Sequence, residues 1–106
     1  MVAAAPAAVL FSIVTLHGSV TLGPTQPVCS AGTPCTKPAA NVILQFTQRN
    51  RLRWVNTDAK GHYTARLEPG TWIVRTNAGV RVTPQRFIVR NVRTQLRNFA
   101  IDTGLR

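Results

Sequence analysis

Few side chains in this sequence could carry acid–base or metal chemistry, and their positions do not group them. The candidates are Asp58, Glu68, Asp102, His17 and His62. A zinc hydrolase needs a close histidine/glutamate ligand pair and a general base, and paired-carboxylate catalysis needs two acids across a cleft. The single glutamate lies beside Pro69, and Asp58 opens a turn sequence. The sequence therefore predicts a protein that is not an enzyme and holds neither a metal nor a cofactor.

Two cysteines, Cys29 and Cys35, lie in the proline-rich segment 23–40. Two thiols cannot form a four-ligand zinc site, and neither histidine stands at ligand spacing from them. A local disulfide is the favoured interpretation, which implies an oxidising compartment, and closing so short a loop would stabilise the fold by about 2 kcal/mol. The alternative is a pair of free thiols in a reducing cytosol.

The charge balance is strongly basic. The chain has 13 Lys+Arg against 3 Asp+Glu, a formal net charge of +10, and only Lys37 and Lys60 among the basic residues are lysines. Such an excess is compatible with an anionic partner, but a solvated arginine-rich surface is the favoured interpretation because the arginines are spread along the chain. The densest cluster, Arg49, Arg51 and Arg53, is a candidate anion-binding face. It is too short a basic run to favour a dedicated nucleic-acid site.

The segment 57–74 has the clearest structural pattern. Residues 58–61 are polar and end in glycine, which suits a tight reversal. Tyr63, Ala65 and Leu67 then alternate with polar residues, as in a half-buried strand. Pro69-Gly70 ends that strand, and the alternation begins again at Trp72. This segment predicts two antiparallel strands joined by a turn.

Similar short runs extend the pattern over most of the chain. Further strands are expected at 16–22, 41–48, 51–56, 80–82, 87–89 and 94–101. About seven short strands, roughly ten residues apart and without helical periodicity, predict an all-β sandwich. Leu96 and Phe99 fall on opposite parities, so a β-bulge is expected near Arg97 and Asn98.

One parity of these strands is apolar and the other is rich in arginine. We expect Leu52, Trp54, Tyr63, Leu67, Trp72, Val74, Phe87 and Val89 to face the core. We expect Arg49, Arg51, Arg53, Arg66, Arg75, Arg86, Arg90 and Arg97 to face solvent. Core burial is thus favoured over an aromatic stacking platform. Exposure of Trp54, Tyr63 or Trp72 beside Arg51 or Arg53 would instead favour ligand binding.

The N-terminal residues 1–14 form an Ala-rich apolar stretch that is too short to span a membrane. Its small residues at 3–5 and 5–7 are similar to the end of a signal peptide, but it lacks a positively charged beginning. Residues 1–14 are interpreted as the remainder of a signal sequence or, through 9–15, as an extra strand. Residues 15–106 are expected to form a single sandwich domain, and no transmembrane segment is predicted.

The pattern T-D-x-x-G-x-Y-x-x-x-L-x-P-G-x-W-x-V over 57–74 resembles the bacterial carboxypeptidase regulatory-like domain. Residues 17–24, with Pro27-Val28-Cys29 and Pro34-Cys35, are similar to the first strand and cysteine-containing loop of small secreted members. The ending 101–106, IDTGLR, resembles their Asp-Thr-Gly-Ile-Arg ending. The resemblance implies a seven-stranded Greek-key β-sandwich of the prealbumin-like (transthyretin-like) type. The C-terminal Tyr-Arg-Gly-Ser of transthyretin-like hydrolases is absent.

This resemblance implies a non-catalytic, secreted or cell-surface accessory module. Its expected partner is a protein or a cell-surface glycan, and exposed sheet edges could support a homodimer. Two other functions stay open from the residues alone. One is a carbohydrate-binding sandwich, and the other is an electrostatic binder of an anionic polymer, either nucleic acid or acidic polysaccharide.

Overall fold

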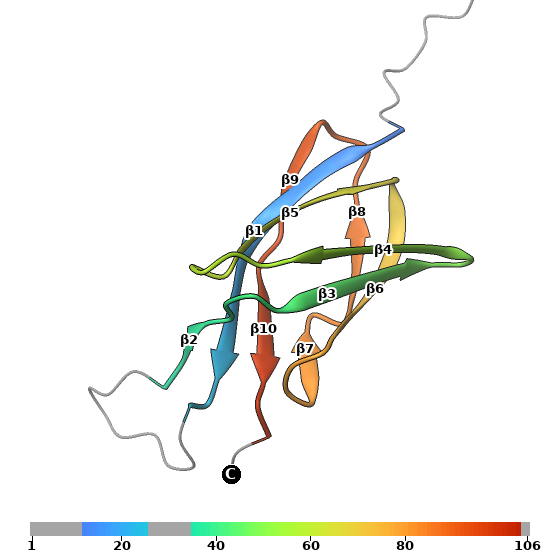
Figure 1. The fold of residues 1–106 in the computed structure, drawn as a ribbon. Coiled ribbons are helices and arrows are strands. Elements are labelled where there is room, and N and C mark those ends of the chain that lie inside the picture. The colour runs from blue at the N-terminus through green and yellow to red at the C-terminus, as the bar shows by residue number, and fades with distance from the viewer. Residues whose placement is uncertain (1–11, 26–34, 105–106) are drawn as a thin grey trace, which may run out of the picture.

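The structure is a computed structural model that describes residues 12–25 and 35–104. These residues form strands, turns and connecting segments, without a helix. The strands are β1 (Val14–Gly23), β2 (Lys37–Pro38), β3 (Ile43–Gln48), β4 (Arg51–Asn56), β5 (His62–Leu67), β6 (Gly70–Thr76), β7 (Arg81–Thr83), β8 (Arg86–Val89), β9 (Thr94–Leu96) and β10 (Phe99–Asp102). They pair into two sheets, which confirms the prediction of an all-β, two-sheet architecture (Figure 1).

The first sheet is organised around the long strand β1. The first half of β1 pairs antiparallel with β5 and parallel with β9. Its second half pairs parallel with β10 and antiparallel with the two-residue strand β2, and β10 also pairs with β7. We call this the β1 sheet. One continuous strand therefore joins all its parts.

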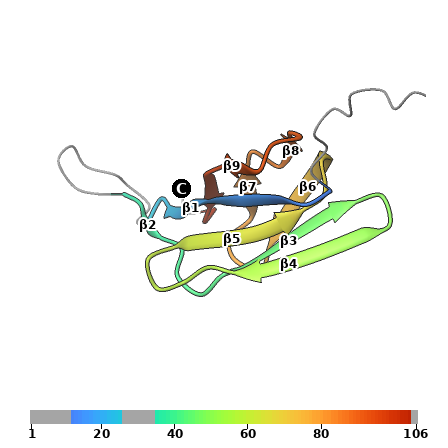
Figure 2. The same ribbon diagram turned by 90° about the horizontal axis from the view of Figure 1, so that it is seen from above.

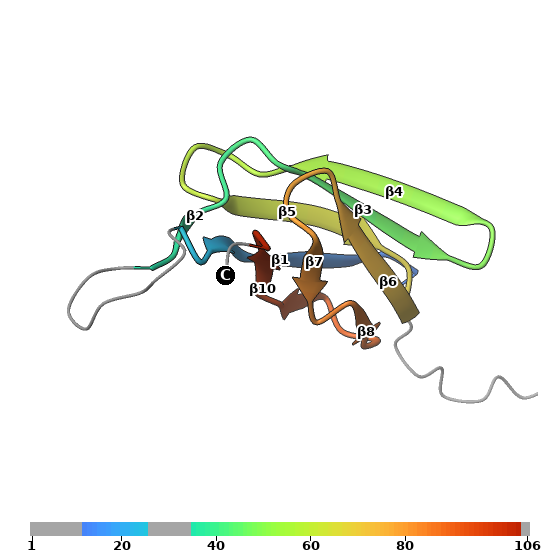
Figure 3. The same cartoon turned by 90° about the horizontal axis from the view of Figure 1, so that it is seen from below.

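The second sheet has the order β4-β3-β6-β8, and every neighbouring pair in it is antiparallel. We call this the β4–β8 sheet. Strands β3 and β4 form a hairpin through the two-residue turn Arg49-Asn50, where Arg49 has a φ of 52°. Figures 2 and 3 show this hairpin in a layer separate from β1, with β5 alongside β4.

The core lies between the inner faces of the two sheets. Trp72 and Phe46 are its largest fully buried side chains. Phe46 contacts Tyr63, Phe87 and Phe99 at ring-centroid distances of 5.9–6.3 Å. The Trp72 indole also donates a 2.8 Å hydrogen bond to the Glu68 carbonyl. The core assignments of Tyr63, Leu67, Trp72, Val74, Phe87 and Val89 are confirmed.

Both turns predicted in the segment 57–74 are present. The Asp58 carboxylate accepts hydrogen bonds from the backbone amides of Lys60 and His62, at 2.8 and 2.9 Å. These bonds lower the pKa of the Asp58 carboxyl below its ordinary value, the bond from His62 contributing most. Gly70 begins β6 at a φ of 130°, a backbone conformation that residues other than glycine rarely adopt. Asp58 is thus a turn residue, as expected.

The predicted inward orientation of Trp54 and Leu52 is wrong. Trp54 is 65% exposed and Leu52 is 44% exposed. The two-residue turn pairs Phe46 with Arg53 and Gln45 with Trp54. Residues paired across antiparallel strands project from the same side of the sheet. Arg53 therefore shares the core side with buried Phe46, while Trp54 projects outward with Gln45.

Arg51 and Arg97 also lie on the inward parity, contrary to the prediction. Arg51 pairs with Gln48 in the same hairpin, and both follow the parity of Phe46. Arg97 follows the parity of buried Gln95 and Phe99, and its guanidinium carbon lies 5.9 Å from the centre of the Phe87 ring. Arg66, Arg75, Arg86 and Arg90 are exposed, as expected.

The bulge expected near Arg97 and Asn98 is absent. His17 pairs with Leu96, and Val20 pairs with Phe99, so both strands advance by three residues across the interruption. At the interruption, the Asn98 side chain accepts a 2.9 Å hydrogen bond from the Ser19 amide in place of a backbone carbonyl. The bulge was predicted on the assumption that Leu96 and Phe99 both face the core. Leu96 is 63% exposed and does not belong to the core, so no bulge is needed.

Several predictions fall on residues outside the described ranges. Cys29 is one of them, so the Cys29–Cys35 disulfide stays a prediction. Residues 1–11 also lie outside, whereas Val14 and Thr15 belong to β1. The alternatives for residues 1–14 therefore stay open.

Candidate functional site

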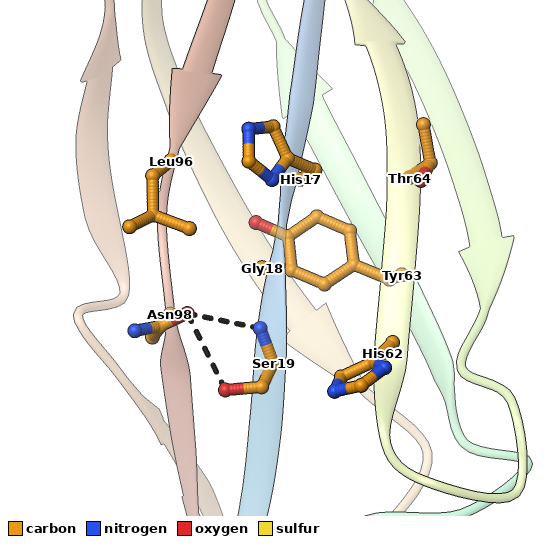
Figure 4. A pocket seen from close by; sticks show the side chains of 8 residues that line it. All are labelled: His17, Gly18, Ser19, His62, Tyr63, Thr64, Leu96 and Asn98. Atoms are coloured by element: carbon orange, nitrogen blue, oxygen red, sulfur yellow. Dashed lines mark hydrogen bonds between the residues drawn. The ribbon is translucent and has the colours of Figure 1, made fainter.

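Two surfaces are candidates for a functional site, one on the outer side of each sheet. The first is a shallow hollow of about 430 Å³ on the β1 sheet. It is lined by His17, Gly18, Ser19, His62, Tyr63, Thr64, Leu96 and Asn98. Figure 4 shows these residues coming from β1, β5 and the β9–β10 segment. The hollow brings together the two histidines that lie 45 positions apart in the sequence.

The hydrogen bonds within this hollow do not activate the Ser19 hydroxyl as a nucleophile. Ser19 pairs with His62 across β1 and β5, but the Ser19 hydroxyl donates to the Asn98 amide oxygen at 3.4 Å (Figure 4). A serine nucleophile needs a base as its hydrogen-bond acceptor, with a third group orienting that base. No acid lines the hollow in the described part of the chain. The hydroxyl of Ser19 therefore lacks the histidine partner that an activated serine would need.

Gly18 explains how the hollow's floor is built. A Cβ on Gly18 would lie 2.1 Å from the Arg97 carbonyl oxygen, closer than atoms can approach. That carbonyl accepts a hydrogen bond from the Tyr63 hydroxyl, which is buried beneath β1. Burial raises the pKa of this hydroxyl far above its ordinary value of 10.0. Gly18, Tyr63 and Arg97 are thus structural supports of the β1 sheet.

The second surface is the outer side of the β4–β8 sheet, which we call the Trp54 face. Pairing places Trp54, Gln45 and Arg75 in one row across β4, β3 and β6. Leu52, Thr47, Ile73 and Arg86 form the next row, which also reaches β8. The apolar part of this face is completed by Ile43 and Ile88, which are 40% and 59% exposed.

The Trp54 face concentrates the exposed apolar side chains of the described residues. Those chains are Ile43, Leu52, Trp54, Val80, Ile88 and Leu96, and only Val80 and Leu96 lie elsewhere. Several exposed apolar side chains on one side of a sheet make it a candidate interaction surface. The charged side chains at its paired strand positions are the exposed cations Arg75 and Arg86. The face is therefore apolar and cationic together.

The predicted cluster of Arg49, Arg51 and Arg53 does not form one free cationic face. The Arg53 guanidinium donates to the Glu68 carboxylate at 3.1 Å, and Arg51 Nε lies 3.4 Å from the other carboxylate oxygen. Both arginines extend from the inward side of β4, whereas Arg49 lies exposed in the hairpin turn. Glu68 neutralises part of this cluster, and its role as an anion-binding face stays a prediction.

All three acids of the chain lie away from the Trp54 face. Asp58 closes its turn, Glu68 binds the two arginines, and Asp102 accepts a 2.8 Å hydrogen bond from the Gly104 amide. In the ranges 12–25 and 35–104, no three His, Cys, Asp or Glu residues gather closely enough to hold a metal ion. These ranges also contain no helix of sufficient length and apolarity to cross a membrane.

Comparison with protein-family models, with curated proteins and with solved structures finds no significant match.

Sequence reasoning missed the Trp54 face, although one signal could have revealed it. The expected strands 41–48 and 51–56 leave only Arg49 and Asn50 between them, and a two-residue turn fixes the register of its hairpin. Pairing outward from this turn places Arg53 opposite Phe46 and hence Trp54 on the outer side. For the hollow, no sequence signal indicated that His17 and His62 would lie on adjacent strands.

Proposed function

We propose that this protein is a non-catalytic accessory module that binds another macromolecule through the Trp54 face. The observation that carries this proposal is the 65% exposure of Trp54, beside other exposed apolar side chains and two arginines. An exposed tryptophan forgoes the free energy that burial of its apolar side chain would contribute to folding. Tryptophan and arginine are also the residues that contribute most of the binding free energy at many interfaces. The resemblance of segment 57–74 to the carboxypeptidase regulatory-like domain supports the same class.

We also propose the seven-stranded Greek-key, prealbumin-like topology for this fold. Strands β9 and β10 share one register along β1, so they count as a single interrupted strand. Strands β2 and β7 have two and three residues and extend the β1 sheet at its margins. Seven main strands then remain. The chain crosses between sheets from β4 to β5 and from β5 to β6, as Greek-key sandwiches do.

The proposed location is secreted or on the cell surface. The support is the family resemblance together with the cysteine pair predicted to form a disulfide. A mass measurement with and without reductant tests the disulfide, because an oxidised pair is two hydrogens lighter. Equal masses would remove this support.

The proposed binding role is tested by capture from extracellular and envelope fractions of the source cell. The immobilised baits are the wild type, Trp54→Ala and Val80→Ala. Val80 is 71% exposed but lies outside the Trp54 face, so its variant controls for loss of an exposed apolar side chain. We expect one macromolecule to be retained by the wild type and Val80→Ala but not by Trp54→Ala. Equal retention by all three baits, or none, would contradict the proposed role.

A further inference from the structure

We infer that the Trp54 face is a docking surface for an acidic polysaccharide, one that carries carboxylates on its sugar rings. This inference rests on the proposed binding role and names its partner. The exposed indole of Trp54 provides a flat apolar surface, against which the C–H-rich face of a pyranose ring can pack. No other aromatic side chain on the described part of this face competes for that position.

The row that contains Trp54 also contains groups that bind hydroxyls and carboxylates. Gln45 is the direct cross-strand partner of both Trp54 and Arg75. Neighbouring strands lie about 4.8 Å apart, so Arg75 stands about 10 Å from Trp54 along the row. Gln45 offers an amide donor and acceptor, and an arginine binds a carboxylate with two parallel hydrogen bonds. A sugar stacked on Trp54 therefore places its substituents toward Gln45 and Arg75.

Charge complementarity selects an anionic over a neutral polysaccharide. The face carries Arg75 and Arg86, and the three acids of the chain lie elsewhere. The formal net charge of +10 adds a long-range attraction for polyanions. It also disfavours a second copy of this chain as the occupant, because two such faces would bring like charges together.

Two other polyanions fit the face less well. Non-specific binding of single-stranded nucleic acid uses several aromatic side chains on which successive bases stack. Here Phe46, Tyr63, Trp72, Phe87 and Phe99 are all buried, which leaves Trp54 as the exposed aromatic side chain among the residues that the structure describes. Protein–protein interfaces have a well-packed apolar centre. On this face, polar Gln45 and Thr47 separate the apolar residues of β4 from Ile73 of β6.

The test measures binding to soluble polygalacturonate and to the same polymer with its carboxylates methyl-esterified. The variants are Trp54→Ala and Arg75→Gln, with Val80→Ala and Arg66→Gln as matched controls. Arg66 is an exposed arginine on the outer side of β5, so its variant removes the same charge away from the face. We expect Trp54→Ala and Arg75→Gln to weaken binding about tenfold, and the two controls to change it less than twofold.

Fluorescence supplies an independent readout, because the other tryptophan, Trp72, is fully buried. We expect polygalacturonate to protect Trp54 from acrylamide quenching, and the methyl ester to protect it much less. Polyglutamate and an oligothymidylate serve as polyanions without pyranose rings, and their binding should not depend on Trp54. Circular dichroism verifies that each variant is folded.

Several outcomes would overturn the inference. They are absence of binding to polygalacturonate, equal binding of its methyl ester, or equal loss in Arg75→Gln and Arg66→Gln. Stronger Trp54-dependent binding of oligothymidylate or polyglutamate would replace the polysaccharide with that polymer. If polygalacturonate fails while Trp54-dependent capture of a protein persists, this inference falls and the accessory-module proposal stands.

Discussion

At the scale of single residues, buried polar groups fix positions that apolar alternation leaves undefined. Thr57 is only 2% exposed, and its hydroxyl accepts a 2.8 Å hydrogen bond from the Val42 amide while donating to the Ala39 carbonyl. Gln95, 5% exposed, accepts from the Arg90 amide and donates to the Ile88 carbonyl. These side chains join neighbouring loops to the core. The sequence pattern offered no reason to bury either of them.

Replacing Thr57 by valine should destabilise the fold by about 1–3 kcal/mol. Valine has nearly the same shape but leaves the buried Val42 amide and Ala39 carbonyl without their partner. Urea unfolding followed by circular dichroism measures the change. The matched control is Thr64→Val, whose threonine is exposed on β5, and it should change stability by less than about 0.5 kcal/mol. Equal stability of Thr57→Val and wild type would show that these hydrogen bonds contribute nothing net.

Tyr63 makes stability sensitive to alkaline pH. Burial raises the pKa of its hydroxyl above the ordinary value of 10.0, although nearby Arg97 lowers it in part. A group with a raised folded-state pKa contributes stability that is complete below the unfolded-state pKa and declines above it. Stability should therefore fall as the pH rises past about 10.

Spectrophotometric titration tests this directly, because Tyr63 is the single tyrosine of the chain. The tyrosinate absorbance should be absent near pH 10.5 in the folded protein and should develop on unfolding in urea at the same pH. A Tyr63→Phe variant has no such absorbance and should lose the alkaline decline. Ionisation of the folded protein with an ordinary pKa would contradict the burial of this hydroxyl.

At the scale of elements, the sequence predicted the strands well and one hairpin's register poorly. Alternation located β1, β3, β4, β5, β6 and β8 to within a few residues, because each has one buried face or a clear turn beside it. It failed on β4, where apolar Leu52 and Trp54 were assigned to the core although pairing with β3 places them outside. Hydrophobicity indicates that a side chain favours burial, whereas the side of the sheet on which it lies is set by the register of the β3–β4 hairpin, which the turn determines. The expected strand 80–82 corresponds to β7, whereas the two-residue strand β2 was not predicted and depends on tertiary pairing with β1.

Gly18 is expected to be essential for the continuity of the β1 sheet. Gly18→Ala introduces a methyl group that would lie 2.1 Å from the Arg97 carbonyl oxygen, which is backbone and cannot rotate away. Overpacking at such a site should cost about 3 kcal/mol and disturb the Tyr63 hydrogen bond to that carbonyl. Thermal unfolding measures the loss, with Ala100→Gly as a control at an exposed position of β10. A Gly18→Ala protein as stable as wild type would contradict the close approach of these strands.

The edge strand β4 is closed by an ion pair with the β5–β6 connection. Arg53 donates both to the Glu68 carboxylate at 3.1 Å and to the Leu52 carbonyl at 3.0 Å. The arginine side chain thereby covers a backbone carbonyl of its own strand, which reduces edge-to-edge association. Both Arg53 and Arg51 are about half exposed, so solvent weakens each pair.

A double-mutant cycle of Glu68→Gln and Arg53→Gln should give a coupling energy of about 0.5–1 kcal/mol at low salt, decreasing as salt is added. Urea unfolding of the four proteins provides the values. The same cycle with Arg66, which is exposed on β5, should give no coupling. Light scattering should show more self-association for the Glu68 and Arg53 variants. Coupling that is zero at low salt would exclude the ion pair as a stabilising contact.

At the scale of the whole molecule, the inner faces of the two sheets form the core, and their margins and outer faces carry the charged side chains. The aromatic core holds the sheets together through Phe46, Phe87 and Phe99. The open margins of the sandwich carry arginines of inward parity, with Arg53 on Glu68 at one margin and Arg97 over Phe87 at the other. The Arg53 side chain is about half exposed, whereas the Arg97 guanidinium packs over the Phe87 ring. The outer surface of the β4–β8 sheet is left free for a partner.

The excess of positive charge should make the folded protein more stable in salt. Thirteen Lys+Arg against three Asp+Glu leave most cations without a counter-charge, so compacting the chain brings like charges together. Salt at about 0.3 M shortens the screening length below the dimensions of the fold and weakens this repulsion. We therefore expect the melting temperature to rise by a few degrees between about 0.02 and 0.3 M sodium chloride. The Glu68 ion pairs oppose this trend, but they involve only two of the arginines.

Scanning calorimetry at several sodium chloride concentrations measures the change in melting temperature. A second series with sodium polygalacturonate distinguishes charge screening from binding at the Trp54 face. Simple salt should raise the melting temperature of the wild type and of Trp54→Ala equally, because screening does not depend on the Trp54 face. A polysaccharide that docks on that face stabilises only proteins that bind it, so it should raise the melting temperature of the wild type more than that of Trp54→Ala. A melting temperature that falls with sodium chloride would mean that the few ion pairs outweigh the net repulsion.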